Sequence, residues 1–343
     1  FSREKKEEER FEEANGNLTR VMLFTNRAMS FMMPALMFVM NGVSVLIIWV
    51  AAKKIDQGVM EVGTMTAFIT YSMMIIMGFL MLTMVSIMLP RAAVAANRID
   101  EVLKTEITIK DSHNALTEKT NNAVVKFDHV DFKYADGEEN VLEDIDFEAK
   151  PGQTVAIIGS TGSGKSTLAK LIPRFFDVTN GKITLDGVDI RDISIETLRS
   201  QIGYVPQTGI LFSGDINSNI SYGAPGIDEA GIKEAAQIAQ ATEFIEDKPD
   251  KFESAIAQGG TNVSGGQKQR LSIARAIARN PKIYIFDDSF SALDFKTDTQ
   301  LRKALKPKTK DATVFIVAQR VSTILHADQI LVLDEGKLVG KGT

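Results

Sequence analysis

The chain has 343 residues, 44% of them hydrophobic, and a formal net charge of −5. This length allows two domains with a sizeable core, and the acidic balance argues against the basic surface that nucleic-acid binding requires, so we expect no nucleic-acid partner. The sequence contains no cysteine, which excludes disulfide bonds and thiolate metal sites. Its three histidines are scattered, and this favours ordinary surface or core roles over metal binding.

Methionine is distributed unevenly along the chain. All 14 methionines lie between Met22 and Met88, and residues 101–343 contain none. This shift predicts a boundary near residue 100, between a first domain over 1–104 and a second over 105–343. The methionines are typical of lipid-facing and packing positions, and an adaptable surface for varied apolar ligands is the alternative.

Two long uncharged runs predict a hairpin of membrane-spanning helices, at about 28–52 and 62–90. At about 1.5 Å per residue, each run exceeds the ~30 Å hydrocarbon core of a bilayer. Residues 1–27 are expected to extend the first helix into the cytoplasm, and residues 91–104 to connect the hairpin to the second domain.

The charges around the hairpin predict its orientation. Basic residues are frequent before residue 28 and recur at Arg91 and Arg98, whereas the loop carries only Lys53 and Lys54. The positive-inside rule places both flanks in the cytoplasm and the loop outside. Two helices do not form a closed bundle in a membrane, so we expect more helices from elsewhere. A chain that starts at Phe1 without methionine is expected to be a fragment of a longer polypeptide.

A glycine-rich loop follows the first buried strand predicted in the second domain, at 155–158, and a helix is expected after it. The loop and the start of the helix comprise Gly159, Ser160, Thr161, Gly162, Ser163, Gly164, Lys165, Ser166 and Thr167. Glycines let backbone N–H groups approach phosphates, and a helix N-terminus attracts the anion. Lys165 is expected to contact the β- and γ-phosphates of a nucleotide, and the Ser166 hydroxyl to bind Mg²⁺.

Two later apolar runs, 283–286 and 314–318, predict buried strands that end in polar residues. The first ends in Asp287 and Asp288. Asp287 is expected to hold Mg²⁺, and Asp288 stands where it could orient or deprotonate an attacking water. Gln319 follows the second run. It can donate a hydrogen bond, but it cannot carry charge or shuttle a proton.

Four further motifs surround these strands in a definite order. Tyr134 precedes the phosphate loop, and Gln207 ends the run Tyr204-Val205-Pro206-Gln207. A small-residue segment then opens a helix predicted over 267–279, at an N-terminus suited to phosphate. Its residues are Ser264, Gly265, Gly266 and Gln267. The last motif is Ser291-Ala292-Leu293-Asp294.

Taken together, these motifs resemble those of ABC-transporter ATPase domains. The resemblance implies that Tyr134 stacks on adenine, and that Gln207 senses Mg²⁺ and couples the site to the membrane domain. It identifies residues 263–267 as the family signature, which faces the nucleotide of a second ATPase domain, and residues 291–294 as the D-loop. ATP and Mg²⁺ are the cofactors that it implies.

The resemblance covers nearly the whole chain. It implies an α/β P-loop ABC ATPase domain preceded by an all-α transmembrane helical hairpin, which is part of an exporter-type (type IV) membrane domain. The hairpin resembles the fifth and sixth helices of an ABC exporter half, and the first four helices of that fold are not in this sequence.

Two catalytic positions depart from the family pattern, which has Glu where Asp288 stands and His where Gln319 stands. Asp is one methylene shorter than Glu, and a misplacement of about 1 Å can cost ~100-fold in rate. Asp288 could still work weakly, but two departures at one centre favour a degenerate site. This pattern resembles heterodimeric, multidrug-type ABC exporters.

That resemblance implies an ATP hydrolase coupled to transmembrane transport, with weak hydrolysis at its own site. Its partner would be a second half-transporter with the family's Glu and His, whose catalytic site the signature of this chain would complete. The expected location is a bacterial inner membrane, with a cytoplasmic ATPase domain and an apolar or amphipathic small-molecule cargo. Two alternatives stay open: an ATP-gated regulatory or channel-like subunit, and a homodimeric exporter with two slow sites.

Overall fold

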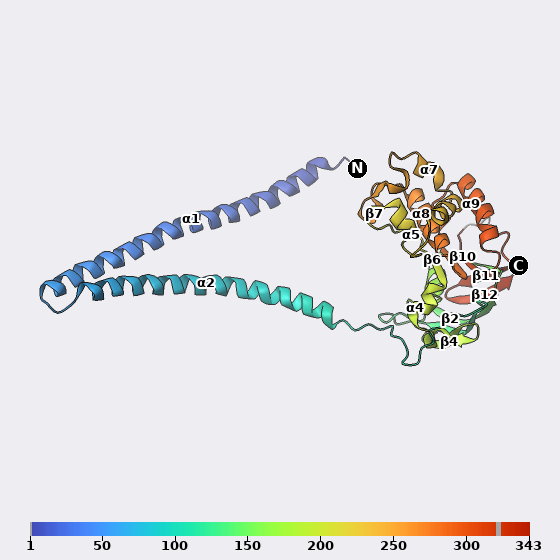
Figure 1. Cartoon of the computed structure of the whole chain (residues 1–343), viewed down its shortest axis with the longest axis horizontal. Helices are drawn as coiled ribbons and strands as arrows, with labels where there is room; N and C mark the ends of the chain where they lie inside the picture. The colour runs from blue at the N-terminus through green and yellow to red at the C-terminus, as the bar shows by residue number, and fades with distance from the viewer. Residues whose placement is uncertain (1, 320–323) are drawn as a thin grey trace. The chain divides into compact units, whose positions relative to one another are not determined.

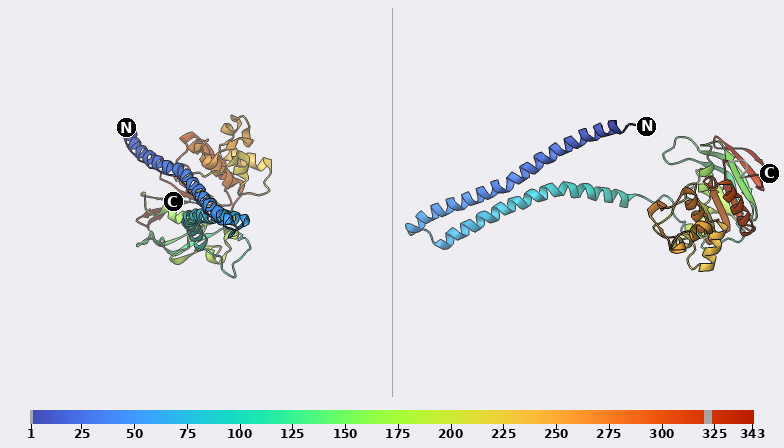
Figure 2. Two further views of the ribbon diagram at one scale, coloured as in Figure 1. Left: turned by 90° about the vertical axis from the view of Figure 1, so that its left-hand side faces the viewer. Right: turned by 90° about the horizontal axis from the view of Figure 1, so that it is seen from above.

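The computed structural model describes residues 2–319 and 324–343, and the chain divides into two units, Phe1–Glu106 and Ile107–Thr343. The first unit is a hairpin of two long helices, α1 (Glu4–Asp56) and α2 (Val62–Lys104). The helices lie closest near the loop that joins them and diverge away from it (Figures 1 and 2). Both extend well past the uncharged runs, because a helix satisfies its own backbone whether its side chains face lipid or water.

The side chains of this hairpin are almost all exposed within the unit. Ala51 is the only buried residue that the structure describes in the two helices, and large apolar side chains such as Phe38 are more than three-quarters exposed. Both helices are long and apolar enough to cross a membrane. A continuous apolar surface of this extent requires lipid or further helices to cover it.

Hydroxyl side chains in the apolar stretches bond to their own helix. Ser44 donates to the carbonyl of Met40 at 3.0 Å, and Thr70 donates to that of Thr66 at 3.0 Å. Such bonds to the residue four positions earlier satisfy the hydroxyl inside the helix. These polar groups therefore need no other partner in the bilayer.

The second unit is built on a ten-stranded sheet with the order β5-β4-β1-β2-β12-β11-β3-β10-β9-β6 among the described residues. The strands β11, β3, β10, β9 and β6 run parallel, and β1, β2, β4 and β5 form an antiparallel wing. The strands are β1 (Val125–Phe132), β2 (Leu142–Ala149), β3 (Thr154–Gly159), β4 (Asn180–Leu185), β5 (Val188–Asp189), β6 (Ile202–Val205), β9 (Ile283–Asp287), β10 (Thr313–Val317), β11 (Gln329–Asp334) and β12 (Lys337–Gly342), with a separate pair β7 (Gly214–Asp215) and β8 (Ala255–Ile256).

Helices cover both faces of the parallel strands. The described helices of this unit are α3 (Lys165–Leu171), α4 (Ile195–Ser200), α5 (Ile216–Ser221), α6 (Glu229–Ile238), α7 (Thr242–Glu246), α8 (Gly265–Ala278) and α9 (Phe295–Lys308), with short 3₁₀ turns η1 (Ile190–Asp192), η2 (Lys251–Glu253) and η3 (Gln258–Gly260). The apolar residues of α6, α8 and α9 join one buried cluster, and those of α3 and α4 join the other.

The central strands are mostly apolar because both of their faces are buried. Successive side chains of a strand point to opposite faces, so Tyr284 and Phe286 of β9 enter the cluster with α8, whereas Ile283 and Ile285 enter the other. All five residues of β9 are buried. An uninterrupted apolar strand of this kind is typical of a parallel sheet covered by helices on both sides.

The strand order determines where the polar residues gather. The neighbours β3, β10, β9 and β6 are parallel, so their carboxyl ends lie along one edge of the sheet. The phosphate loop follows β3, Gln319 follows β10, the two aspartates end and follow β9, and Gln207 follows β6. Ligands of open parallel sheets bind at such carboxyl ends.

Candidate nucleotide site

The phosphate loop forms a tight turn between β3 and α3. Ser160, Thr161 and Gly162 are exposed at its tip, while Ser163 and Gly164 are buried. Gly164 has φ +96°, and a Cβ there would lie 2.7 Å from Cδ2 of Leu142. The loop therefore requires glycine at this position, both for the left-handed backbone and for the close approach of β2.

Lys165 is buried and folds back over its own loop. Its Nζ donates to the carbonyl oxygen of Gly159 at 2.9 Å and to that of Ser160 at 2.5 Å. Burial lowers the pKa of Lys165, whereas the carboxylates of Asp288 and Asp287 act in the opposite direction. Two carbonyl dipoles thus hold a cation at the loop, where a phosphate group would be a stronger partner.

Asp287 forms the buried end of β9 and accepts two hydrogen bonds. Its side chain is joined through Oδ1 to the Ser166 hydroxyl at 2.7 Å and through Oδ2 to the Tyr204 hydroxyl at 3.1 Å. The residue is only 2% exposed. A hydroxyl and a carboxylate are hard oxygen ligands of the kind that Mg²⁺ prefers, so the two predicted metal residues that meet here fit that ion.

Asp288 is bound by the side-chain amides of both other residues that were predicted to be catalytic. Its Oδ2 accepts from Gln319 Nε2 at 2.9 Å and from Gln207 Nε2 at 3.3 Å. Asp288 is 8% exposed and has a left-handed φ of +48°. Two residues from separate motifs therefore converge on the carboxylate of a third. Gln207 was also predicted to bind the metal, but among the described residues no hydrogen bond joins it to Ser166 or Asp287.

Tyr134 lies just beyond the end of β1, close to the phosphate loop. Its hydroxyl is 3.1 Å from Oγ1 of Thr167. Its ring meets Phe132 and Phe176 edge-on, at 4.8 and 5.2 Å between centroids. These contacts fix the ring of Tyr134 beside Thr167, the residue that follows Ser166 of the phosphate loop.

The signature segment begins α8. Ser264 Oγ accepts from the backbone N–H of Gln267 at 3.3 Å, and Gln267 Oε1 accepts from the N–H of Ser264 at 3.0 Å. This reciprocal capping box starts the helix at Gly265, two residues earlier than the predicted Gln267. Ser264 and Gly265 are exposed. Among the described residues, no hydrogen bond joins this segment to the phosphate loop of the same chain.

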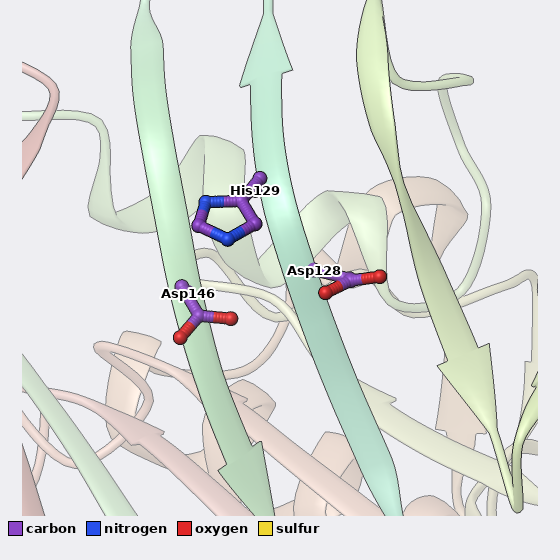
Figure 3. A group of neighbouring side chains, drawn as sticks. All are labelled: Asp128, His129 and Asp146. Carbon is purple, nitrogen blue, oxygen red and sulfur yellow. The ribbon is translucent and has the colours of Figure 1, made fainter.

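One histidine lies in a cluster that sequence analysis did not anticipate. Asp128 and His129 of β1 and Asp146 of β2 place potential ligand atoms within 4.8 Å of one another (Figure 3). Lys126 Nζ is 3.1 Å and Lys182 Nζ 3.7 Å from the Asp128 carboxylate. Asp128 is thus already neutralised by lysines, which is the pattern of an ordinary exposed ion-pair network.

Sequence analysis did not single out Tyr204, whose hydroxyl contacts Asp287 in this site. The residue was noted only as part of the run that leads to Gln207. Burial and the neighbouring Asp287 carboxylate raise the pKa of its phenol. The missing signal is the strand order: only when β6 is placed beside β9 does an aromatic on one strand point to an aspartate on the other.

Comparison with known proteins gives a consistent result for both units. Residues 142–291 match the family model "ABC transporter", and residues 1–79 match the model "ABC transporter transmembrane region". The chain is 43% identical, over its full length and 59% of the relative, to an uncharacterised ABC transporter ATP-binding protein of Mycobacterium bovis.

Two further relatives have more informative names. The ATP-dependent lipid A-core flippase of Desulfotalea psychrophila is 37% identical over the whole chain and 60% of the relative. A solved structure of a bacterial Atm1-family ABC exporter with ATP bound has a TM-score of 0.82 and 32% identity, and the match covers all of this chain and 60% of that one. The chain therefore spans about three-fifths of the length of the relatives that it matches.

Proposed function

We propose that this chain, which belongs to the ABC transporters and carries part of their transmembrane region followed by their ATPase domain, is one subunit of an ATP-driven exporter and holds ATP at a degenerate site. The observation that carries the proposal is the pair of hydrogen bonds that the Asp288 carboxylate accepts. A single oxygen of this shortened carboxylate accepts from two amides, those of Gln207 and Gln319. Each donor helps to fix the position of this carboxylate, which is one methylene shorter than the family's Glu.

Nucleotide binding uses the parts of the site that keep the family pattern. Lys165 would exchange its two carbonyl partners for phosphate oxygens, and Tyr134 would support the base. Ser166 and Asp287 would hold Mg²⁺, which supplies neutralisation of the phosphate charge when bound. The bond of 2.7 Å between the Ser166 hydroxyl and Asp287 Oδ1 holds these two oxygen ligands side by side.

Hydrolysis at this site would be slow for two reasons. Asp288 is a methylene shorter than the family's Glu, so its carboxylate falls short of the attacking water. Gln319 donates a hydrogen bond but brings no positive charge to the γ-phosphate. Bound ATP would then act mainly as a ligand of the closed dimer, stabilising it by about 2.7 kcal/mol at a concentration 100-fold above Kd.

The signature segment would act on the partner. Ser264 and Gly265 are exposed at the start of a 14-residue helix, and helix N-termini favour bound phosphate. In a head-to-tail dimer this segment would complete the nucleotide site of a second half-transporter, which carries the family's Glu and His. This chain would therefore contribute to turnover chiefly in trans.

The hairpin favours an apolar or amphipathic cargo. Its spans contain no charge to pair with a charged solute, and hydroxyls such as that of Ser44 are satisfied within their own helix. One relative is named as a lipid A-core flippase, and a lipid of this kind is amphipathic. We place the protein in a bacterial inner membrane, with the ATPase domain on the cytoplasmic side.

Nucleotide trapping in the full-length complex tests the proposal. Under single-turnover conditions with labelled ATP, the site built on Lys165 should retain intact ATP while the partner's site accumulates ADP. Lys165→Ala should abolish the retained ATP. Equal and rapid turnover at both sites would contradict the asymmetry, and an active dimer of this subunit alone would favour a homodimer.

A further inference from the structure

The carboxylate of Asp287 is held at both of its oxygens by hydroxyl groups. Ser166 bonds to Oδ1 at 2.7 Å, and Tyr204 bonds to Oδ2 at 3.1 Å. The role of Ser166 follows from the phosphate-loop pattern, whereas that pattern assigns no role to Tyr204.

The position of Tyr204 is fixed by strand pairing. In the parallel pair β6–β9, Tyr204 lies opposite Ile285, two residues before Asp287. The length of the phenol side chain covers this offset and brings its hydroxyl to the end of the neighbouring strand. A shorter hydroxyl residue, such as serine, at the same position would not reach the carboxylate.

The ring of Tyr204 is also held in orientation. It meets the ring of Phe175 edge-on, with 5.3 Å between the ring centroids and 85° between the ring planes. The guanidinium of Arg199 lies over the Phe175 ring, 5.2 Å from its centroid. The phenol hydroxyl is the donor in its bond to Asp287, because an ionised carboxylate can only accept.

We propose that Tyr204 is a positioning residue for magnesium: by bonding Oδ2 of Asp287 it fixes the carboxylate so that Oδ1 faces the Ser166 hydroxyl at the metal position. This inference rests on the proposed Mg-ATP site. Residues that orient a metal-binding carboxylate through a hydrogen bond commonly change metal affinity by 10- to 100-fold when removed. The effect should fall on magnesium dependence rather than on nucleotide binding itself.

The test is Tyr204→Phe in the full-length complex, which removes one oxygen and keeps the ring against Phe175. Photolabelling with 8-azido-ATP, followed by separation of the subunits, reports nucleotide on this chain alone. The free Mg²⁺ that gives half-maximal labelling should rise about tenfold, while labelling in excess EDTA stays unchanged. Tyr222→Phe is the matched control, because it removes the same atom from an exposed tyrosine and should leave both values unaltered.

Two outcomes would overturn the inference. One is an unchanged or lower half-maximal Mg²⁺ for Tyr204→Phe, which would make the hydrogen bond incidental. The other is an equal loss of labelling with and without Mg²⁺, which would indicate a general structural role. Failure of the nucleotide site itself is distinguished by Lys165→Ala: if that variant labels like the wild type, the proposed function fails whatever Tyr204 does.

Discussion

Restoring the two divergent residues should restore hydrolysis at this site. Asp288→Glu adds one C–C bond, about 1.5 Å, to the reach of the carboxylate, and Gln319→His supplies a group that can carry charge. The present carboxylate accepts from Gln319 Nε2 at 2.9 Å. Because a misplacement of about 1 Å costs ~100-fold in rate, the double variant should raise turnover about 100-fold, which equals about 2.7 kcal/mol of barrier.

The assay must isolate this site from that of the partner. In the full-length complex, the phosphate-loop lysine of the partner is replaced so that only the site built on Lys165 can turn over, and phosphate release is measured. Asp288→Asn keeps the size of the side chain without its charge and should remain at the low starting rate. A double variant within twofold of the starting rate would refute the reasoning, because the slow step would then lie outside these two residues.

Two further predictions concern binding and stability. Gly164→Ala should weaken ATP binding more than tenfold in a titration, because the added Cβ would lie 2.7 Å from Leu142 at a φ of +96°. Burial alone would raise the pKa of Asp186, but hydrogen bonds from the backbone of Val124, Asn122 and Ala123 outweigh it and hold the pKa below 3.8. Asp186→Asn should therefore lower the Tm at neutral pH. The difference in Tm between the variant and the wild type should shrink as pH falls below 3.8 through the native pKa. An equal difference in Tm at all pH values would contradict this assignment.

The parts of the fold that the sequence predicts well are those with a local cause. The apolar run 283–286 is β9 with one residue added, and 155–158 is β3 with one residue added at each end. Burial on both faces leaves such runs without polar interruption, so their limits are visible in the sequence. The uncharged runs mark the hydrocarbon region and not the ends of the helices, since α1 extends from Glu4 to Asp56 and α2 from Val62 to Lys104.

The contacts within the site depend on strand order, which the sequence does not display. The motifs identify Asp288, Gln207 and Gln319 separately, but their convergence on a single oxygen requires β10, β9 and β6 to be neighbours. The same is true of the bond between Tyr204 and Asp287. Contacts between residues more than 30 positions apart are properties of the sheet, so they could not be read from spacing.

The most direct test of the account compares two substitutions in the steady-state ATPase of the full-length complex. Among the described residues, a Cβ at Gly266 would meet only the Ala292 carbonyl oxygen, at 3.4 Å, and an acidic residue is tolerated in the first turn of a helix. Gly266→Asp should therefore fold and act by repelling the phosphate of the partner's nucleotide. The account predicts that Gly266→Asp abolishes turnover whereas Lys165→Ala only lowers it. Equal damage by both would show that this chain's own site turns over, which would contradict the central claim.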